Sequence, residues 1–451
     1  MMEKSFRDLK AKIINTGLCV RCGICIGVCP VDVISKDSDC YPCLNGTCID
    51  CGICYKVCPG GEVDFKKLHK EVFNKKYKIE NITGYVESVS LCNAKESRVR
   101  NAGSSGGVVT MLLLYLLEKG HIDGAIVVTT DDHNPLISRG VLARTKEEIL
   151  KAAKSKYIVT PSMEILKQIR SLDGKFAIVG LPCQVHGIRK LANVYPELFQ
   201  KIYIILGLIC HYTLEPDSIK SLAHIKKINE DEIEKFEFRG GEWPGNFRFT
   251  MKDGSNKNLA NLSIPFTMNW MFAFFSPYRC YRCFDGINEF ADLSFGDFLA
   301  DAFGKNFVGK RQQTMVFQKS VKGRSVLDNA VREGYVERYI ITGSELSNRT
   351  IHMIREKKNK SLVLLKVDKN KGKYTPDYGI EIAQISKTIN RIRAKNLIIS
   401  FLRKRKIRNV LLNIIFSKLG RLIDKLNYWR KKNFTSYLKN KNLPFTDQKD
   451  N

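Results

Sequence analysis

Residues 19–30 read CVRCGICIGVCP, and residues 48–59 repeat the same pattern as CIDCGICYKVCP. Each stretch has the cysteine spacing C-x2-C-x2-C-x3-C, with a proline directly after the last cysteine. In this arrangement the first three cysteines wrap around one [4Fe-4S] cluster, and the fourth binds the other cluster. We therefore predict two crossed ligand sets, which are Cys19, Cys22, Cys25 and Cys58 for one cluster, and Cys48, Cys51, Cys54 and Cys29 for the other.

Zinc binding is the main alternative for these cysteines. Zinc ribbons use two separate C-x2-C pairs and do not repeat four cysteines with a trailing proline. The repeated pattern therefore favours an α+β ferredoxin-like domain over residues 1–65 that holds two clusters. Cys40 and Cys43 form an additional C-x2-C pair between the two stretches. They are either loop thiols or half of another metal or redox site, because one such pair is a weak pattern.

The length and composition indicate a globular protein of two or three domains. The chain has 451 residues, more than one hydrophobic core usually organises, and 44% of them are hydrophobic. Its amino terminus lacks the apolar core of a secretory signal, so we expect the 15 cysteines to stay reduced and to serve as metal ligands. Apolar runs such as 111–117 and 202–209 are shorter than the ~20 residues that cross a membrane. We expect a cytoplasmic protein, or at most one bound peripherally to a membrane.

From about residue 86 the chain alternates between predicted strands and predicted helices. Helical patterns at 110–119 and 146–154 lie between short apolar runs that are typical of buried strands, namely 125–129, 176–180 and 203–209. This alternation predicts an α/β body, with helices packed on a mixed sheet. Residues 236–238 and 247–251, followed by a turn sequence at 252–255, predict an inserted hairpin.

The small-residue stretch 101–108, NAGSSGGV, runs directly into the predicted helix at 110–119. Unpaired backbone N–H groups and the positive dipole end of a helix favour a bound phosphate group. The stretch matches neither G-x-G-x-x-G nor the Walker loop, the two common nucleotide-binding glycine motifs. A phosphate site and an ordinary helix cap are therefore both open at this position.

Four of the remaining cysteines could form a further metal site. Cys183 and Cys210 come at the ends of predicted strands, and Cys280 and Cys283 form a C-x2-C pair. If these segments converge at one sheet edge, their four thiolates would hold a third [4Fe-4S] cluster. A four-cysteine zinc site and free buried cysteines are the alternatives. Cys92 has no companion and is expected to pack as a small hydrophobic side chain.

From residue 15 to about residue 340, the chain resembles a known family, the beta subunits of coenzyme F420 hydrogenases and dehydrogenases. The resemblance rests on many motifs that follow one another in a fixed order. Besides the two cysteine stretches, these are SSGG (104–107), GHIDG (120–124), SKY (155–157), GLPCQ (180–184), GLIC (207–210), CYRCFD (280–285) and DLSFGD (292–297).

This resemblance implies that residues 85–378 form an α/β flavoprotein body that binds FAD and a further [4Fe-4S] cluster. The FAD would lie against the helix start after the SSGG motif, between the SKY region and the GLPCQ turn. The implied FAD contacts are Ser104, Ser105, Gly106, Gly107, Lys156, Tyr157, Gly180 and Pro182. No residue is predicted to be catalytic.

Members of the family pass electrons between flavin and clusters, commonly with reduced coenzyme F420, a two-electron deazaflavin. The resemblance therefore implies an oxidoreductase that transfers electrons between such a donor and a one-electron acceptor, with a protein redox partner. One alternative is a ferredoxin-dependent reductase of an organic substrate, linked to polysaccharide biosynthesis. Another is a non-catalytic subunit that only relays electrons.

The segment 379–451 carries much of the positive charge and lies beyond the resemblance. Between residues 387 and 441, 17 Lys and Arg accompany one acidic residue, Asp424, which accounts for +16 of the net +28. Apolar residues recur there at helical spacing, namely Leu411, Ile415, Leu422, Leu426 and Trp429. This pattern predicts a basic helical tail that binds an anionic membrane surface or an acidic partner, or one that docks on the body and leaves its basic side in water. Nucleic acid is not an expected partner, because no recognition motif accompanies the charge.

Overall fold

The computed structural model describes residues 4–241, 245–261, 265–297, 313–341 and 348–381, together with residues 408, 410 and 411. The chain divides into two compact units. The first consists of Met1–Asp217 and Ser276–Asn396, and the second of Ser218–Phe275 and Leu397–Asn451.

The cysteine stretches lie in a small module at the amino-terminal end of the first unit. Its elements are α1 (Phe6–Leu9), η1 (Lys10–Ile14), α2 (Ile24–Gly27), β1 (Ile34–Lys36), β2 (Pro42–Leu44), α3 (Ile53–Lys56) and α4 (Phe65–Phe73). A capping box begins α1, because Ser5 and Asp8 each bind the other's backbone N–H. Apolar side chains such as Leu9, Ile13 and Ile26 pack among the cysteines and form the core of the module.

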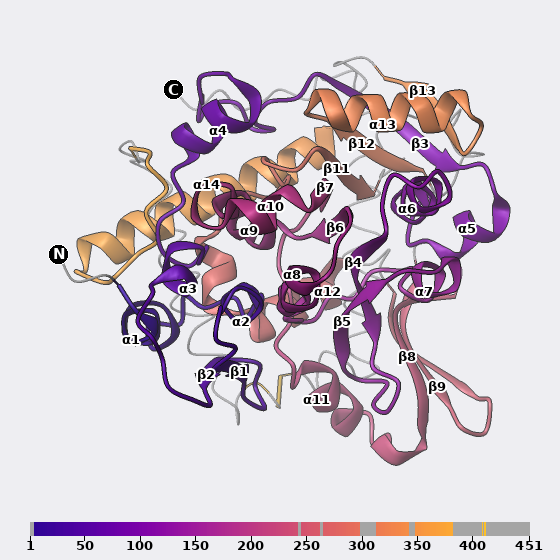
Figure 1. Cartoon of the computed structure of the whole chain (residues 1–451). Helices are drawn as coiled ribbons and strands as arrows, with labels where there is room; N and C mark the ends of the chain where they lie inside the picture. Colours follow the sequence, from indigo (N-terminus) through magenta and orange to yellow (C-terminus); the bar gives the residue numbers. More distant parts are fainter. Residues whose placement is uncertain are drawn as a thin grey trace, which may run out of the picture. The chain divides into compact units, whose positions relative to one another are not determined.

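The body of the first unit is an eight-stranded mixed sheet with helices on both faces (Figure 1). Its strand order is β13-β3-β12-β11-β7-β6-β4-β5. The strands are β3 (Ser88–Ala94), β4 (Gly124–Thr130), β5 (Ser138–Ala143), β6 (Phe176–Gly180), β7 (Ile202–Leu208), β11 (Leu293–Asp297), β12 (Thr314–Gln318) and β13 (Val336–Ile340). The predicted α/β body is confirmed, and the three predicted buried strands correspond to β4, β6 and β7.

Alternating side chains of the central strands pack into two separate cores. Val127 and Ala177 join the core beneath α6 (Val108–Glu118), α7 (Lys146–Lys151) and α13 (Val321–Arg332). Ile126 and Ile178 join the opposite core, which α4 also enters. The other helices on that side are η2 (Ser162–Ile165), α8 (Leu166–Ser171), α9 (Pro182–Val194), α10 (Pro196–Gln200) and α14 (Asn348–Asn370). The cysteine module therefore shares a core with one face of the sheet.

Strand direction brings several loops to one edge of the sheet. The strands β4, β6, β7 and β11 are parallel, and β12 is antiparallel to both β11 and β3, so β3 runs with the parallel group. The carboxyl ends of five strands thus share one edge, together with the amino end of β12. The loop after β3 leads into α5 (Ser97–Ala102) and then α6, and the loop after β6 leads into α9. The helix η4 (Tyr278–Arg282) lies beside these loops. In open α/β sheets, this edge is where ligands bind.

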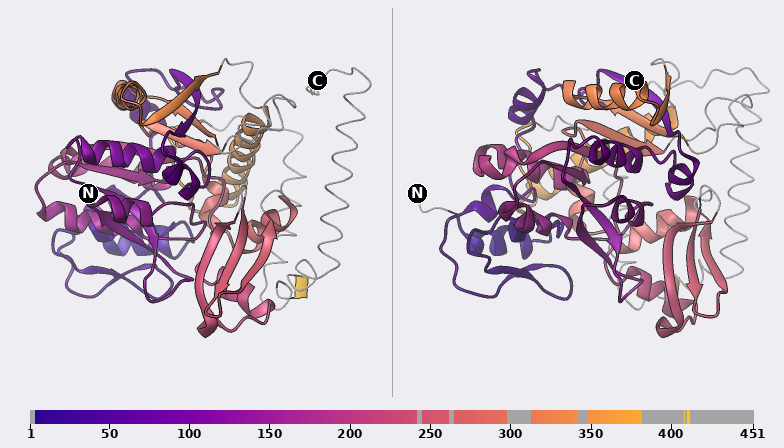
Figure 2. Two further views of the ribbon diagram at one scale, coloured as in Figure 1. Left: turned by 90° about the vertical axis from the view of Figure 1, so that its right-hand side faces the viewer. Right: turned by 45° about the vertical axis from the view of Figure 1, so that its right-hand side comes forward.

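The second unit contains a three-stranded antiparallel sheet in the order β10-β9-β8, visible in both views of Figure 2. Its elements are α11 (Ser218–Ile225), η3 (Glu230–Glu232), β8 (Ile233–Gly240), β9 (Asn246–Met251), β10 (Asn256–Asn261) and α12 (Pro265–Phe275). Contacts among Phe236, Phe238, Phe247 and Phe249 bury one face of this sheet. The predicted hairpin is confirmed, and its turn at 252–255 joins β9 to β10.

The predicted basic helix over 387–441 lies outside the described residues, apart from Arg408, Val410 and Leu411. The domain limits at residues 65, 85 and 378 likewise stay predictions. In the parts of the chain that the structure describes, no helix is long and apolar enough to cross a membrane.

Candidate iron–sulfur and redox sites

Two cavities in the amino-terminal module correspond to the two predicted ligand sets. The lining of the first includes Cys19, Cys22, Cys25 and Cys58. The lining of the second includes Cys29, Cys48, Cys51 and Cys54. In each cavity, three cysteines come from one stretch and the fourth comes from the other. The fold thus brings together the thiols in the crossed arrangement that the spacing predicts.

Left-handed backbone turns shape both ligand loops. In the first stretch, Arg21 and Gly23 have φ of 54° and 84°, and in the second, Asp50 and Gly52 have φ of 52° and 71°. These turns fold the loop back, so that the N–H of Arg21 donates to the sulfur of Cys19 at 3.4 Å and the N–H of Asp50 donates to Cys48 at 3.4 Å. Such N–H groups stabilise sulfur that carries negative charge.

Burial raises the pKa of several of these thiols, to about 12 for Cys19 and about 12 for Cys54. Neighbouring thiols in the same cavity raise the pKa further, because their charges repel. These raised pKa values mean that the thiols do not ionise readily by themselves. They would ionise if the cavity held a positively charged group. Iron supplies this charge, and thiolate binding to a metal releases the protons. The donor set therefore fits [4Fe-4S] clusters.

A third group of thiols lies at the carboxyl edge of the sheet. Cys183 is the second residue of α9, which follows β6, Cys210 follows β7, and Cys280 and Cys283 lie in and after η4. Burial raises the pKa of Cys183, and charges on the other three thiols raise it further. Cys210 likewise has a pKa raised to about 12, first by burial and then by Cys280 and Cys283. The structure therefore gathers all four predicted cysteines into one body site.

The first module site and the body site are neighbours. A Cβ on Gly187, four residues after Cys183 on α9, would lie 2.7 Å from the side chain of Ile24, two residues after Cys22. The N–H of Met163, in the body, donates to the carbonyl oxygen of Cys22 at 2.9 Å. Within the described ranges, no group of three His, Cys, Asp or Glu side chains is arranged to hold a single metal ion. A cubane binds its thiolates at separate iron atoms, so its ligands stand further apart than those of one tetrahedral zinc ion.

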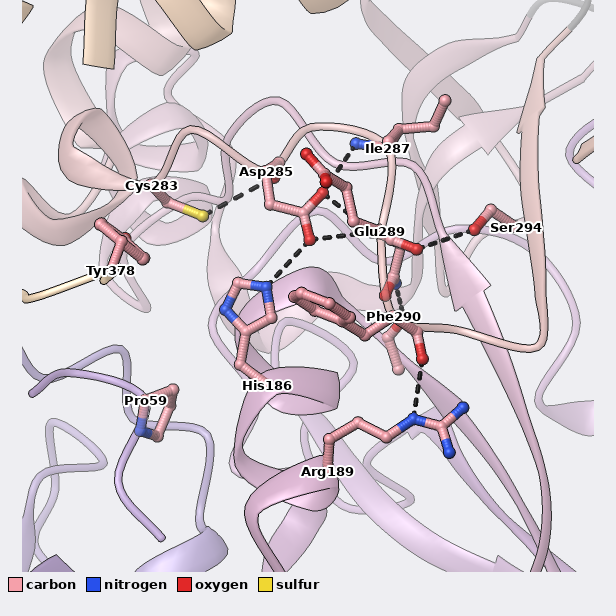
Figure 3. A network of polar contacts seen from close by, with 12 residues as sticks. Pro59, His186, Arg189, Cys283, Asp285, Ile287, Glu289, Phe290, Ser294 and Tyr378 are labelled. Carbon is pink, nitrogen blue, oxygen red and sulfur yellow. Dashed lines mark hydrogen bonds and ion pairs between the residues drawn. The ribbon is translucent and has the colours of Figure 1, made fainter. Parts of the chain in front are cut away.

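A buried polar network adjoins the body site (Figure 3). His186, on α9, and Asp285, just after Cys283, are both fully buried, with 2.9 Å between Nε2 and Oδ2. Asp285 also accepts hydrogen bonds from the backbone N–H groups of Ile287 and Glu289. Burial alone would raise the pKa of Asp285. The hydrogen bond with His186 and the electrostatic interaction with His186 instead lower this pKa. The network fixes the turn that follows Cys283. Sequence analysis missed it, because its members are nearly a hundred residues apart.

Basic side chains bind the backbone next to the module cysteines. Lys190 Nζ donates to the carbonyl oxygens of Cys58 at 3.0 Å and of Glu62 at 2.6 Å. Arg279 Nη2 donates to the carbonyl oxygen of Pro59 at 2.9 Å. Arg170 donates to the carbonyl oxygen of Cys29. No sequence motif marks these three residues, although Arg279 directly precedes a predicted ligand.

The predicted FAD loop lies between β3 and β12 at the same sheet edge. Ser105 Oγ lies 2.7 Å from Thr314 Oγ1, and the N–H of Gly106 donates to Thr314 Oγ1 at 2.9 Å. Gly107, with φ of 72°, precedes the first residue of α6. A Cβ on Gly106 would lie 2.5 Å from the carbonyl oxygen of Cys92, so this glycine is required by the protein's own packing. The glycines of this loop therefore have a structural role, and a phosphate group at the helix start stays a prediction.

The other predicted FAD residues lie near the same edge. Ser104 Oγ accepts a hydrogen bond from the N–H of Ser155 at 2.7 Å, which joins the loop to the Lys156–Tyr157 segment. Lys156 Nζ donates to the carbonyl oxygens of Ala152 and Ala153, at the end of α7. Gly180 ends β6 and Pro182 opens α9.

The unassigned cysteines have distinct surroundings. Cys40 lines the first cavity beside the predicted ligands. Cys43 lies on β2, with its sulfur 3.3 Å from Ser35 Oγ. Cys92 is fully buried in the core beneath α6, which confirms its predicted role as a small hydrophobic side chain.

Comparison with protein families places these sites in a known context. The N-terminal part of the coenzyme F420 hydrogenase/dehydrogenase beta subunit matches residues 89–167, and its C terminus matches residues 173–342. A 4Fe-4S binding domain matches residues 12–35. The predicted resemblance is thus confirmed, and so is [4Fe-4S] binding as a property of the amino-terminal module.

Three curated relatives are each similar to half or more of the chain. The coenzyme F420-dependent sulfite reductase of Methanocaldococcus jannaschii is 32% identical over 246 residues, which is 51% of this chain but only 36% of that protein. A component of the F(420)H(2) dehydrogenase of Methanosarcina mazei is 26% identical, over 63% of this chain and 77% of its own length. The beta subunit of the coenzyme F420 hydrogenase of Methanosarcina barkeri is 28% identical, over 56% of this chain and 81% of its own length.

One solved structure shares the fold. A chain of the F420-reducing [NiFe] hydrogenase complex from Methanosarcina barkeri superimposes with a TM-score of 0.52 and 23% identity. The match covers 66% of this chain and 98% of that chain.

Proposed function

The chain belongs to the coenzyme F420 hydrogenase/dehydrogenase beta subunit family, and we propose that it is a flavin- and iron–sulfur-dependent oxidoreductase. It would transfer electrons between a two-electron carrier, such as reduced coenzyme F420, and a one-electron acceptor. The observation that carries the proposal is the packing of the first module loop against the body site: a Cβ on Gly187, four residues after Cys183, would lie 2.7 Å from the side chain of Ile24, two residues after Cys22. Two thiol sites this close suit a relay of single electrons.

The chain's own residues would hold three [4Fe-4S] clusters. The two module cavities supply four thiols each, and the body site supplies Cys183, Cys210, Cys280 and Cys283. Six of these twelve cysteines are buried and the other six are half-buried, which limits the access of water to their sulfurs. The hydrogen bond between His186 and Asp285 holds α9 against the segment that carries Cys283, which fixes the separation of two body ligands.

FAD would lie at the carboxyl edge of the sheet, with its diphosphate at the start of α6. The contact between Ser104 and Ser155 supports this placement, since it brings two predicted FAD segments together. Bound FAD would accept two electrons and release them one at a time. The residues around it would orient it and position its partner, and none of them is proposed to take part in bond making.

Two other functions remain candidates. A ferredoxin-dependent reductase would take single electrons at the module and deliver them to an organic substrate at the sheet edge. A relay subunit would have no substrate of its own. The sulfite reductase relative does not decide between them, because this chain spans about a third of its length.

Anaerobic stopped-flow spectroscopy distinguishes the three functions. The purified protein would be mixed separately with reduced coenzyme F420, NADH and reduced ferredoxin, while flavin and cluster absorbance are followed. Bleaching by reduced coenzyme F420 alone is expected. Bleaching by ferredoxin alone would favour the reductase, and bleaching by none would favour the relay.

Metal analysis tests the cluster assignment independently of activity. We expect about twelve iron atoms and twelve acid-labile sulfides per chain, from three clusters. Iron near eight, accompanied by about one zinc, would instead assign the body thiols to zinc.

The FAD site needs a variant that spares the packing of the loop. Gly106 is unsuitable because any side chain there would strike the backbone. Ser104→Asp adds a negative charge that would repel the diphosphate of FAD. The same charge does not destabilise α6, because a carboxylate near the start of a helix is favourable. We expect FAD content to fall with unchanged iron content, and Ser104→Asn to serve as the neutral control. Equal FAD content in both variants would place the diphosphate elsewhere.

For the basic tail, we propose binding to an anionic membrane surface. Each Lys or Arg near such a surface contributes on the order of 1 kcal/mol, screened by salt. The chain truncated after Tyr378 should keep its cofactors but lose its binding to liposomes that contain acidic lipid. Loss of FAD or precipitation of the truncated chain would show that the tail packs on the body instead.

A further inference from the structure

Arg279 is a fully buried cation at the boundary between the amino-terminal module and the body site. It lies on η4, immediately before Cys280, and none of its surface is exposed. Its Nη2 donates to the carbonyl oxygen of Pro59, the residue after Cys58, at 2.9 Å. Its guanidinium carbon lies 5.4 Å from the ring centre of Tyr378. One side chain thus joins the loop of a module ligand to the segment of a body ligand.

The charge of Arg279 is not neutralised by any carboxylate of the described residues. Two of its nitrogens, Nε and Nη1, have no hydrogen-bond partner. Leaving a buried cation unpaired costs several kcal/mol or more, so native proteins rarely do so without a reason. An orphaned buried donor of this kind indicates a negatively charged group nearby.

Ligand segments from both sites flank this cation. Its Nη2 contacts Pro59, which directly follows Cys58 of the first module cavity. Cys280 of the body site directly follows Arg279 in the chain, and Cys283 follows at the end of η4. Figure 3 shows Pro59, Cys283 and Tyr378, three of these neighbours, around the end of α9 that carries His186. The guanidinium therefore lies within electrostatic reach of ligands from two proposed clusters.

We propose that Arg279 is an electrostatic bridge that raises the reduction potentials of the first module cluster and the body cluster. When either cluster takes up one electron, it gains one negative charge, and a fixed positive charge nearby stabilises that reduced form. An electron that leaves one cluster reduces the other, so the same cation favours the reduced state at both ends of this transfer. The inference rests on the proposed cluster assignment, and it makes Arg279 a residue that acts through the clusters.

Two other arginines of the first unit, the buried Arg282 and the half-buried Arg170, each have a carboxylate partner. Arg282 forms an ion pair with Asp368, with 2.7 Å between Nε and Oδ2. Arg170 donates to the carbonyl oxygen of Cys29, much as Arg279 donates to Pro59, but Asp32 neutralises it at 2.8 Å. Arg170 is therefore a matched control, because it contacts the backbone of a cluster ligand with its charge balanced.

The test is a redox titration of the complete, cluster-loaded protein, monitored by electron paramagnetic resonance. Arg279→Gln should keep its iron and shift the midpoints of the first module cluster and the body cluster to more negative values. We expect the reduced-to-oxidised ratio at fixed potential to fall about tenfold, equivalent to about 59 mV for a one-electron couple. Arg279→Lys, which keeps the charge, should restore most of the shift. Arg170→Gln should shift no midpoint by a comparable amount.

Unchanged midpoints in a fully loaded Arg279→Gln protein would overturn the proposal. If the Arg279→Gln protein loses iron, the reduction midpoints of the Arg279→Lys protein test the proposal instead. Wild-type midpoints in a loaded Lys variant support the role of the charge, whereas displaced midpoints contradict it. Loss of iron from both variants would make Arg279 a structural residue and overturn the proposal. Iron near eight in the wild-type protein would refute the body cluster, but the effect on the first module cluster would still be read from its own signal.

Discussion

The two cysteine cavities of the module are built from the same sequence pattern and yet have different surroundings. The first packs against the body of the unit, and a Cβ on its Gly23 would lie 2.5 Å from the carbonyl oxygen of Pro161. Lys190 and Arg279 bind the backbone beside its fourth ligand. The second is bordered by Ile49, which is 58% exposed, and Val31, which is 41% exposed. The ligand motif therefore fixes the type of cluster, whereas the surroundings decide what the cluster can do.

These surroundings predict separate roles for the two clusters. The first is enclosed, close to cations and next to the body site, as an internal relay requires. The second has exposed apolar residues at its rim, as a docking point for a protein donor or acceptor requires. Four experiments test this contrast, in decreasing order of the change that we expect.

Substitution of the fourth, crossed cysteine of each ligand set should have the largest effect. Cys58→Ser is expected to remove the first cluster, although Cys58 belongs to the second sequence stretch, and Cys29→Ser is expected to remove the second cluster. Each variant should lose about four iron atoms, and electron paramagnetic resonance should show which cluster is missing. If each variant lost the cluster of its own stretch, the crossed assignment would be wrong.

The residues after the two prolines offer a sharper comparison. Gly60 follows Pro59 and is buried, and a Cβ there would lie 2.9 Å from the carbonyl oxygen of Leu18 and 2.5 Å from Ile13. Its counterpart Val31 is exposed. Gly60→Val should therefore destabilise the module by about 1–3 kcal/mol through overpacking. Thermal unfolding measures the loss.

Val31→Gly is the reciprocal control and should change the melting temperature far less. Equal destabilisation by the two changes would show that the two sites are packed alike, and the contrast between them would then fail.

Exposure to air should damage the clusters at different rates. The second cavity has exposed residues at its rim, so we expect the signal of its proposed cluster to decay severalfold faster than that of the first. Timed oxygen exposure followed by Mössbauer or electron paramagnetic resonance spectroscopy measures both rates. Equal rates, or faster loss of the first cluster, would count against its enclosure.

A surface charge beside the second cavity should have the smallest effect. Ile49→Asp is expected to slow electron exchange with a protein donor severalfold, because a charged side chain disfavours apolar docking, while iron content stays unchanged. Leu44→Asp is the control, since Leu44 is also exposed but does not line the cavity. An equal effect of the two changes would place the docking surface elsewhere.

Much of the architecture could be predicted from the sequence because its signals are local. Short apolar runs predicted β4, β6 and β7, since a buried parallel strand requires a continuous apolar stretch. The order of the sheet was not predictable in this way. The placement of β3 between β12 and β13 depends on antiparallel pairings between segments more than two hundred residues apart.

The two crossed ligand sets could be predicted from the sequence alone, because three cysteines of each set lie within one stretch of about a dozen residues and the repeated motif supplies the fourth from the other stretch. The surroundings of those sets, in contrast, depend on the tertiary structure. It placed Arg279 beside Pro59, paired His186 with Asp285, and packed the loop of Cys22 against the helix that carries Cys183. Burial and electrostatic interactions depend on distance in space, and no local pattern in the chain records which remote residues will meet.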